Sequence, residues 1–104
     1  MKLYVGGVCQ GQEELARQEN PGAEIFAHFE EKLRGVDDPQ AFALSFCDDH
    51  PDAVVVADEI GCGIVPMDPK ERAWREAAGR ALCVIARQSG QVVRVFCGIG
   101  VRIK

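Results

Sequence analysis

Short apolar runs alternate with stretches of helix-spaced apolar residues along most of the chain. The runs are rich in β-branched residues, which is typical of strands buried in a parallel sheet. The expected strands are residues 3–5, 23–29, 54–56, 91–97 and 101–103. Helices are expected over residues 12–19, from Asp37 or Asp38 to about Asp49, and from Pro69 to Ser89. This alternation predicts one α/β domain over residues 1–104, with a mainly parallel sheet and helices on its faces.

Two boundaries stay open in this pattern. Proline is favoured in the first helical turn, so either Asp37 or Asp38 could begin the helix that contains Pro39. Residues 30–35 could extend the preceding strand or turn into a helix, because their polar and apolar residues follow neither period.

The stretch at residues 54–66 is the centre of the predicted architecture. Its run of valines reads as a central strand beside residues 3–5, and Asp58 and Glu59 follow where that strand should leave the sheet. Ligands of open α/β sheets bind outside the carboxyl ends of the strands. We therefore expect Asp58 and Glu59 at the functional edge, where Glu59 could instead pair with Arg72 or Lys70.

Charge and hydropathy exclude some classes of partner. The formal net charge is −4, which argues against nucleic acid and anionic membranes. No apolar run approaches the roughly 18 residues of a membrane span, and the first residues do not resemble a signal peptide. These features predict a cytoplasmic protein.

The five cysteines have no C-x-x-C spacing, so neither a disulfide framework nor a zinc site is expected. Cys83 and Cys97 lie in apolar runs and are expected to be small core residues. Cys9 and Cys62 should meet at one sheet edge. Cys9 precedes a helix, which can lower a thiol pKa, although nearby Glu13 opposes a thiolate.

The loop after the first strand has part of a phosphate-binding motif. Gly6 and Gly11 keep the spacing of G-x-x-x-x-G-K-[ST], but Gln12 replaces the lysine and Glu13 replaces the Ser/Thr. The candidate cofactor-binding residues are Gly6, Gly7, Cys9, Gly11, Gln12 and Glu13. The local charge moves by about two units against an anion, each worth about 4 kcal/mol at ~4 Å and an effective dielectric constant near 20. The loop is thus built against tight nucleotide binding, unless Arg102 or Lys104 supplies the charge.

Three motifs resemble a known family. They are V-V-V-A-D-E-I-G-C-G-I-V-P at residues 54–66, W-R-E-A-A-G-R-A-L at 74–82 and V-F-C-G-I-G-V-R-I-K at 95–104. In this order they resemble the C-terminal half of the bifunctional adenosylcobinamide kinase / adenosylcobinamide-phosphate guanylyltransferase family of cobalamin biosynthesis. That family also opens with a strand and G-G-A-R-S-G-K-S, the position of residues 6–13 here.

The resemblance implies a P-loop-NTPase-like three-layer fold, with ATP or GTP and Mg²⁺ as cofactors and a corrinoid as a possible ligand. Glu59 matches the family's glutamate in N-E-V-G, where it could hold Mg²⁺, and Asp58 replaces the asparagine. Family members are longer, and their guanylyl-accepting histidine has no counterpart here. His28 and His50 lack its arginine-flanked context and are interpreted as ordinary polar or loop residues.

Two hypotheses follow. The first is a shortened member that has lost phosphoryl transfer and binds a nucleotide or corrinoid weakly or serves as a partner subunit. The second is a minimal nucleotide-dependent enzyme that uses Asp58 and Glu59 as catalytic residues and backbone N–H groups for phosphate. Gln12 and Glu13 favour the first. Apolar residues at the rim of the sheet, namely Ile60, Ile64, Val65 and Val101, also predict a homo-oligomer.

Overall fold

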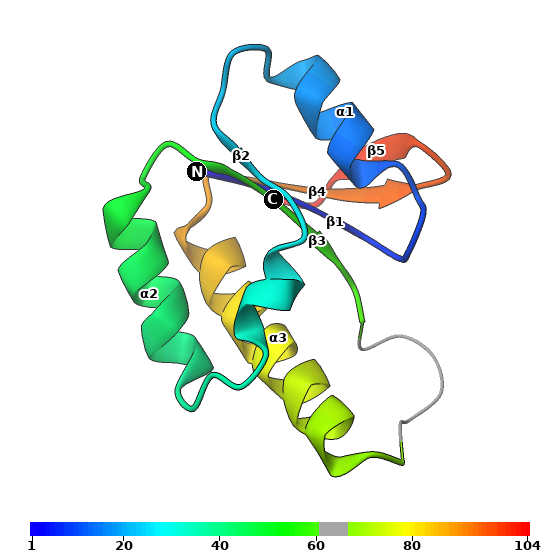
Figure 1. Cartoon of the computed structure of the whole chain (residues 1–104). Helices are drawn as coiled ribbons and strands as arrows, with labels where there is room; N and C mark the ends of the chain where they lie inside the picture. Colours follow the sequence, from blue (N-terminus) through cyan, green and yellow to red (C-terminus); the bar gives the residue numbers. More distant parts are fainter. Residues whose placement is uncertain (61–66) are drawn as a thin grey trace.

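Five strands form one sheet in the order β2-β3-β1-β4-β5 in the computed structural model, which describes residues 1–60 and 67–104 (Figure 1). The strands are β1 (Lys2–Gly6), β2 (Ile25–Phe26), β3 (Val54–Asp58), β4 (Gln91–Phe96) and β5 (Ile99–Arg102). The pairs β2–β3, β3–β1 and β1–β4 are parallel, and β4–β5 is antiparallel. The predicted, mainly parallel sheet is confirmed.

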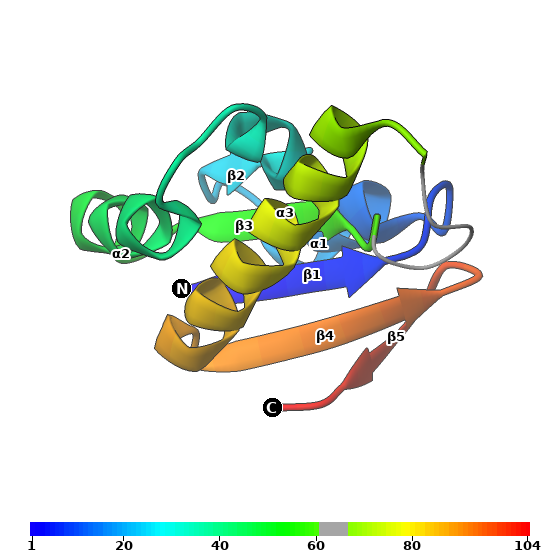
Figure 2. The same ribbon diagram turned by 90° about the horizontal axis from the view of Figure 1, so that it is seen from below.

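Helices cover both faces of this sheet (Figure 2). They are α1 (Gln12–Glu19), the 3₁₀ helix η1 (Phe29–Leu33), α2 (Pro39–Asp49) and α3 (Pro69–Gln88). Helix α1 packs on one face against Tyr4, Val56 and Val93, and the other helices pack on the opposite face against Leu3 and Val55. Three layers result, as expected for a P-loop-NTPase-like fold.

The valine run of β3 lies inside the sheet, with relative exposures of 3%, 0% and 2% for Val54, Val55 and Val56. It pairs with β1 on one side and β2 on the other, and Gly6 aligns with Asp58 at the end of the pair. The middle strand of the five is β1, and β3 lies directly beside it. Both strands end at the same edge, which brings the β1–α1 loop beside the carboxylates that follow β3.

The second strand is shorter than its alternating pattern predicts. Residues 23–29 were expected to be extended, but β2 covers Ile25–Phe26 alone. His28 has a φ of 53°, a left-handed conformation that ends the extended backbone. Phe29 then begins η1, which settles the open assignment of the following residues as a 3₁₀ helix.

The expected burial of Cys83 and Cys97 is wrong. Cys83 lies on the exposed side of α3, and Cys97 lies in the β4–β5 turn with a φ of 51°. Among the cysteines that the structure describes, Cys47 on α2 is the buried one, and burial raises the pKa of its thiol. In the apolar runs around these two cysteines, other side chains face the core.

Helix α3 is amphipathic, with apolar residues on one side and charged residues on the other. Its buried residues recur at helical spacing and are Ala77, Ala78, Ala81, Val84 and Ile85. Its opposite side carries charged residues such as Arg80, which pairs with Glu76. Within the described residues, no helix is both long enough and apolar enough to cross a membrane.

Candidate functional site

The β1–α1 loop depends on two glycines. A Cβ on Gly6 would lie 2.6 Å from the carbonyl oxygen of Val95, so no larger residue fits there without a shift of the backbone. Gly11 has a φ of 87° and directly precedes α1, and this conformation favours glycine. Backbone geometry therefore requires the two glycines that carry the phosphate-loop spacing.

The same loop is tied to the β4–β5 turn through Gln10. The backbone carbonyl of Gln10 accepts a hydrogen bond from the Gly98 N–H at 2.7 Å. Its side-chain Oε1 accepts another from the Cys97 N–H, also at 2.7 Å. The loop thus connects the middle strand with the hairpin at one edge of the sheet.

Gln12 replaces the lysine of the phosphate-loop motif and is 4% exposed. Its Nε2 donates to the Gly6 carbonyl at 3.3 Å and to the Gly7 carbonyl at 3.0 Å. The same nitrogen donates to Asp58 Oδ1 at 2.6 Å. A neutral amide therefore links the loop to the end of β3, at the position where the motif places a cation.

The two carboxylates after β3 have different surroundings. Asp58 accepts the bond from Gln12 and lines the cavity described below. The Glu59 backbone N–H donates to the Gly6 carbonyl at 2.7 Å, and its carboxylate lies 3.4 Å from Arg94 of β4. Asp58 thus belongs to the loop, whereas Glu59 pairs with a basic residue that the sequence did not indicate.

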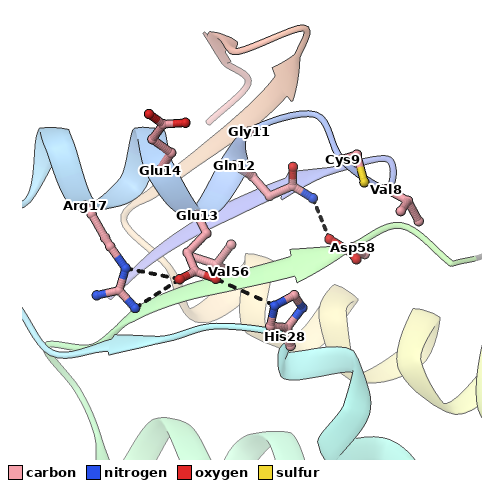
Figure 3. A pocket seen from close by; sticks show the side chains of 10 residues that line it. All are labelled: Val8, Cys9, Gly11, Gln12, Glu13, Glu14, Arg17, His28, Val56 and Asp58. Atoms are coloured by element: carbon pink, nitrogen blue, oxygen red, sulfur yellow. Dashed lines mark hydrogen bonds and ion pairs between the residues drawn. The ribbon is translucent and has the colours of Figure 1, made fainter.

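A cavity of about 530 Å³ opens beside the loop and α1 (Figure 3). Its lining residues are Val8, Cys9, Gly11, Gln12, Glu13, Glu14, Arg17, His28, Val56 and Asp58. The lining carries three carboxylates, one arginine and one histidine. Arg17 lies 3.1 Å from Glu13, so that carboxylate offsets its charge. The cavity is acidic on balance and suits a cation or a neutral ligand better than a phosphate.

His28 and Glu30 are the residues that sequence reasoning missed. His28 Nε2 lies 3.6 Å from Glu13 Oε1, and its Nδ1 lies 3.9 Å from Glu30 Oε2. Glu30 is 2% exposed, and its Oε1 accepts the Asp58 N–H at 2.6 Å. Burial raises the pKa of the Glu30 carboxyl above its ordinary value, and the Asp58 charge adds to the increase. Both residues follow a strand in the sequence. This position would have indicated them as site residues if β2 had been known to lie beside β3.

Most of the candidate residues come together. Cys9, Gly11, Gln12, Glu13 and Asp58 line one cavity. Of the rest, Gly6 and Gly7 supply carbonyls that hold Gln12, and Glu59 faces Arg94. Cys62 lies outside the described residues, as do Ile64 and Val65.

Arg102 and Lys104 are not near the loop. The Lys104 ammonium donates to the carbonyls of Ala86 and Arg87, at the C-terminal end of α3. Arg102 Nε donates to the Lys104 carbonyl. These groups lie near the beginning of β4, whereas the loop lies at the edge where β1 and β3 end. They do not replace the charge of the missing lysine.

ATP or GTP with Mg²⁺ fits this arrangement poorly. Phosphate sites combine backbone N–H groups with a lysine charge and a hydroxyl that binds Mg²⁺. Here Gln12 supplies an amide that is already bonded, and Glu13 adds a carboxylate at the helix N-terminus. The basic side chain in the lining, Arg17, is paired with Glu13.

Comparison with known proteins identifies relatives of the chain. The family described as cobinamide kinase / cobinamide phosphate guanyltransferase matches residues 14–103. The bifunctional adenosylcobalamin biosynthesis protein CobU of Salmonella typhimurium is 39% identical over 72 residues, which cover 68% of this chain and 40% of that protein. The CobU protein of Escherichia coli K12 is 43% identical over 51 residues, or 49% of this chain and 28% of the relative. The matched part therefore spans at most about two fifths of these relatives.

Proposed function

Because the chain belongs to the cobinamide kinase / cobinamide phosphate guanyltransferase family, we propose that it is a non-catalytic member with a degenerate phosphate-binding loop. Its role would be weak binding of a nucleotide or corrinoid, or service as a partner subunit, in cobalamin biosynthesis. The proposal includes a cytoplasmic location. The observation that carries the proposal is the buried Gln12 amide, which bonds Gly6, Gly7 and Asp58 where a phosphate loop has its lysine.

Two further observations support loss of phosphoryl transfer. Glu13 follows Gln12 in the position of the Mg²⁺-binding hydroxyl, and it pairs with Arg17 and His28. The family match begins at residue 14, after this loop and its glycines.

Titration calorimetry with ATP, GTP and cobinamide, each with Mg²⁺, tests this proposal. The unmodified chain should bind neither nucleotide more tightly than roughly millimolar, which corresponds to about 4 kcal/mol. Micromolar binding of ATP or GTP would overturn the proposal and favour a minimal nucleotide-dependent enzyme.

A double variant tests the physical reason. Gln12→Lys with Glu13→Ser restores a cation and a hydroxyl on a loop whose glycines are still present, so nucleotide affinity should rise by about tenfold, or 1.4 kcal/mol. The matched control is Gln12→Lys with Glu14→Ser, which changes the net charge equally but leaves Glu13 in place. Equal improvement in both would show that general charge, rather than the loop chemistry, limits binding.

A further inference from the structure

Three side chains of the metal-ligating type converge at the carboxyl ends of β2 and β3. They are His28, Glu30 and Asp58, and one nitrogen or oxygen atom from each lies within 4.8 Å of the others. His28 follows β2, Glu30 belongs to η1, and Asp58 ends β3. The cluster opens into the cavity, because His28 and Asp58 are part of its lining (Figure 3).

Within the part of the chain that the structure describes, no lysine or arginine forms an ion pair with Glu30 or Asp58. Glu30 is 98% buried, and within the described parts of the chain His28 is its one ion-pair partner, at 3.9 Å. Asp58 forms no ion pair among the described residues, and its carboxylate accepts a hydrogen bond from the neutral Gln12 amide. A buried carboxylate is costly unless it is paired or binds a metal. The imidazole of His28 therefore pairs with Glu30 but not with Asp58, which leaves these two neighbouring carboxylates with a deficit of positive charge.

Each of the three side chains also contacts a further polar group. Glu30 Oε1 accepts the Asp58 N–H at 2.6 Å, and Asp58 Oδ1 accepts from Gln12 Nε2 at 2.6 Å. The second ring nitrogen of His28 lies 3.6 Å from a Glu13 oxygen. Metal-binding histidines commonly direct their other ring nitrogen at a carboxylate in this way.

We propose that His28, Glu30 and Asp58 bind a divalent transition-metal ion such as Zn²⁺ or Co²⁺. One imidazole nitrogen and two carboxylate oxygens suit such ions better than Mg²⁺, which favours oxygen ligands and keeps several waters. Direct ligation at about 2.0–2.2 Å requires the ligand atoms to move closer together than they are here. The His28 side chain is 65% exposed and can make this movement, while Glu30 stays fixed in the core. His28 and Asp58 line the cavity, so water in the cavity can supply further ligands to the ion.

Titration of the intact chain with Co²⁺ alone, followed by visible absorption, tests the site. We expect one Co²⁺ per chain with micromolar affinity, and displacement by Zn²⁺. His28→Asn removes the nitrogen ligand but keeps a residue that tolerates a positive φ, so the variant should fold and bind roughly 10-fold to 100-fold more weakly. Glu30→Gln should weaken binding as well while it keeps the hydrogen bond to the Asp58 N–H.

Two control variants separate this site from other metal ligands. His50→Asn changes the other histidine, which packs against Phe26 and Phe46 away from the cavity, and should bind as the unmodified chain does. Cys9→Ser removes the thiol in the cavity lining and should also leave affinity unchanged. Binding weaker than millimolar, binding unaffected by His28→Asn, or binding lost in Cys9→Ser would overturn the proposal. No nucleotide is present in these titrations, so their result is independent of the proposed function.

Discussion

Gln12 forms a buried polar link within the β1–α1 loop. A lysine at this position would bring a positive charge toward a phosphate, whereas the glutamine amide is neutral and divides its two N–H groups among three acceptors. A buried amide of this kind is costly to remove, because its acceptors would lose their donor in a site that water does not reach freely. At this residue, the side chain is a structural link between the loop and the end of β3.

Tyr4 provides a second buried polar contact, on the α1 side of the sheet. Its hydroxyl donates to Glu19 Oε1 at 2.7 Å and accepts from Asn20 Nδ2 at 3.0 Å. We expect Tyr4→Phe to lower the free energy of unfolding by about 1–2 kcal/mol at pH 7, since it removes both hydrogen bonds. Urea denaturation of the two proteins measures this difference.

The same pair of proteins should differ in their response to alkaline pH. Burial, followed by the Glu19 carboxylate, raises the pKa of Tyr4 in the folded state above its ordinary value of 10.0. The unfolded chain therefore loses the proton first, and the stabilisation by the hydroxyl is complete below pH 10 but falls as pH rises through the folded pKa. The difference between wild type and Tyr4→Phe should shrink above pH 10. A constant difference would contradict this assignment.

Among the secondary-structure elements, α2 has a well-defined first turn. The sequence left Asp37 and Asp38 as alternative starts, and the structure selects Asp38, whose Oδ1 accepts the Ala41 N–H at 3.1 Å. Asp38→Ala should destabilise the fold by about 1 kcal/mol through loss of this N-cap. Thermal denaturation compares it with Asp37→Ala, which makes the same charge change without removing the cap. Equal losses in both variants would show that the cap does not matter.

The helices and the strands differed in how well the sequence predicted them. Proline and glycine punctuate α2 and α3, so their bounds were predicted within a residue or two. β2 was overpredicted because its alternating residues fit an extended strand, whereas His28 takes a positive φ and Phe29 is buried in a 3₁₀ turn. The alternation of polar and apolar residues carries no information about such a local change in backbone direction.

The candidate site was predicted only in part, for a related reason. Gly11, Gln12 and Asp58 were found because each lies next to a recognisable strand or loop signal. His28 and Glu30 were not, because their importance depends on β2 lying beside β3, and strand order follows from packing of the whole sheet. Glu59 was placed at the correct edge, but its pairing with Arg94 required the position of β4.

At the scale of the whole molecule, the β4–β5 hairpin leaves apolar surface exposed. Phe96 and Ile99 lie opposite each other, as do Arg94 and Val101, so these side chains share the face on which α3 packs. Phe96, Ile99, Val101 and Ile103 are between 57% and 68% exposed. Of the rim residues first considered, Ile60 packs against the core instead. Among the described residues, these four form a group of exposed apolar side chains on the hairpin and just after it.

We expect this hairpin to bind a second copy of the chain. β5 is an edge strand whose outer backbone groups can pair with an identical antiparallel strand, and such a two-fold contact is self-complementary. Light scattering at high micromolar concentration should show a dimer, and Val101→Glu should reduce it to a monomer. Leu44→Glu, which charges an exposed apolar residue on α2, is the matched control and should remain dimeric. A monomeric wild-type chain would contradict this prediction.

The two hydrogen bonds from Gln10 to the β4–β5 turn also have a consequence for motion. We expect the loop and the turn to fluctuate as one cooperative unit, because a displacement of the loop breaks its bonds to Cys97 and Gly98. A contact that stabilises the hairpin should then also slow the opening of the loop. For a ligand bound in the cavity beside that loop, we therefore expect the dissociation rate to depend partly on the β5 edge of the sheet, opposite the β2 edge that carries His28.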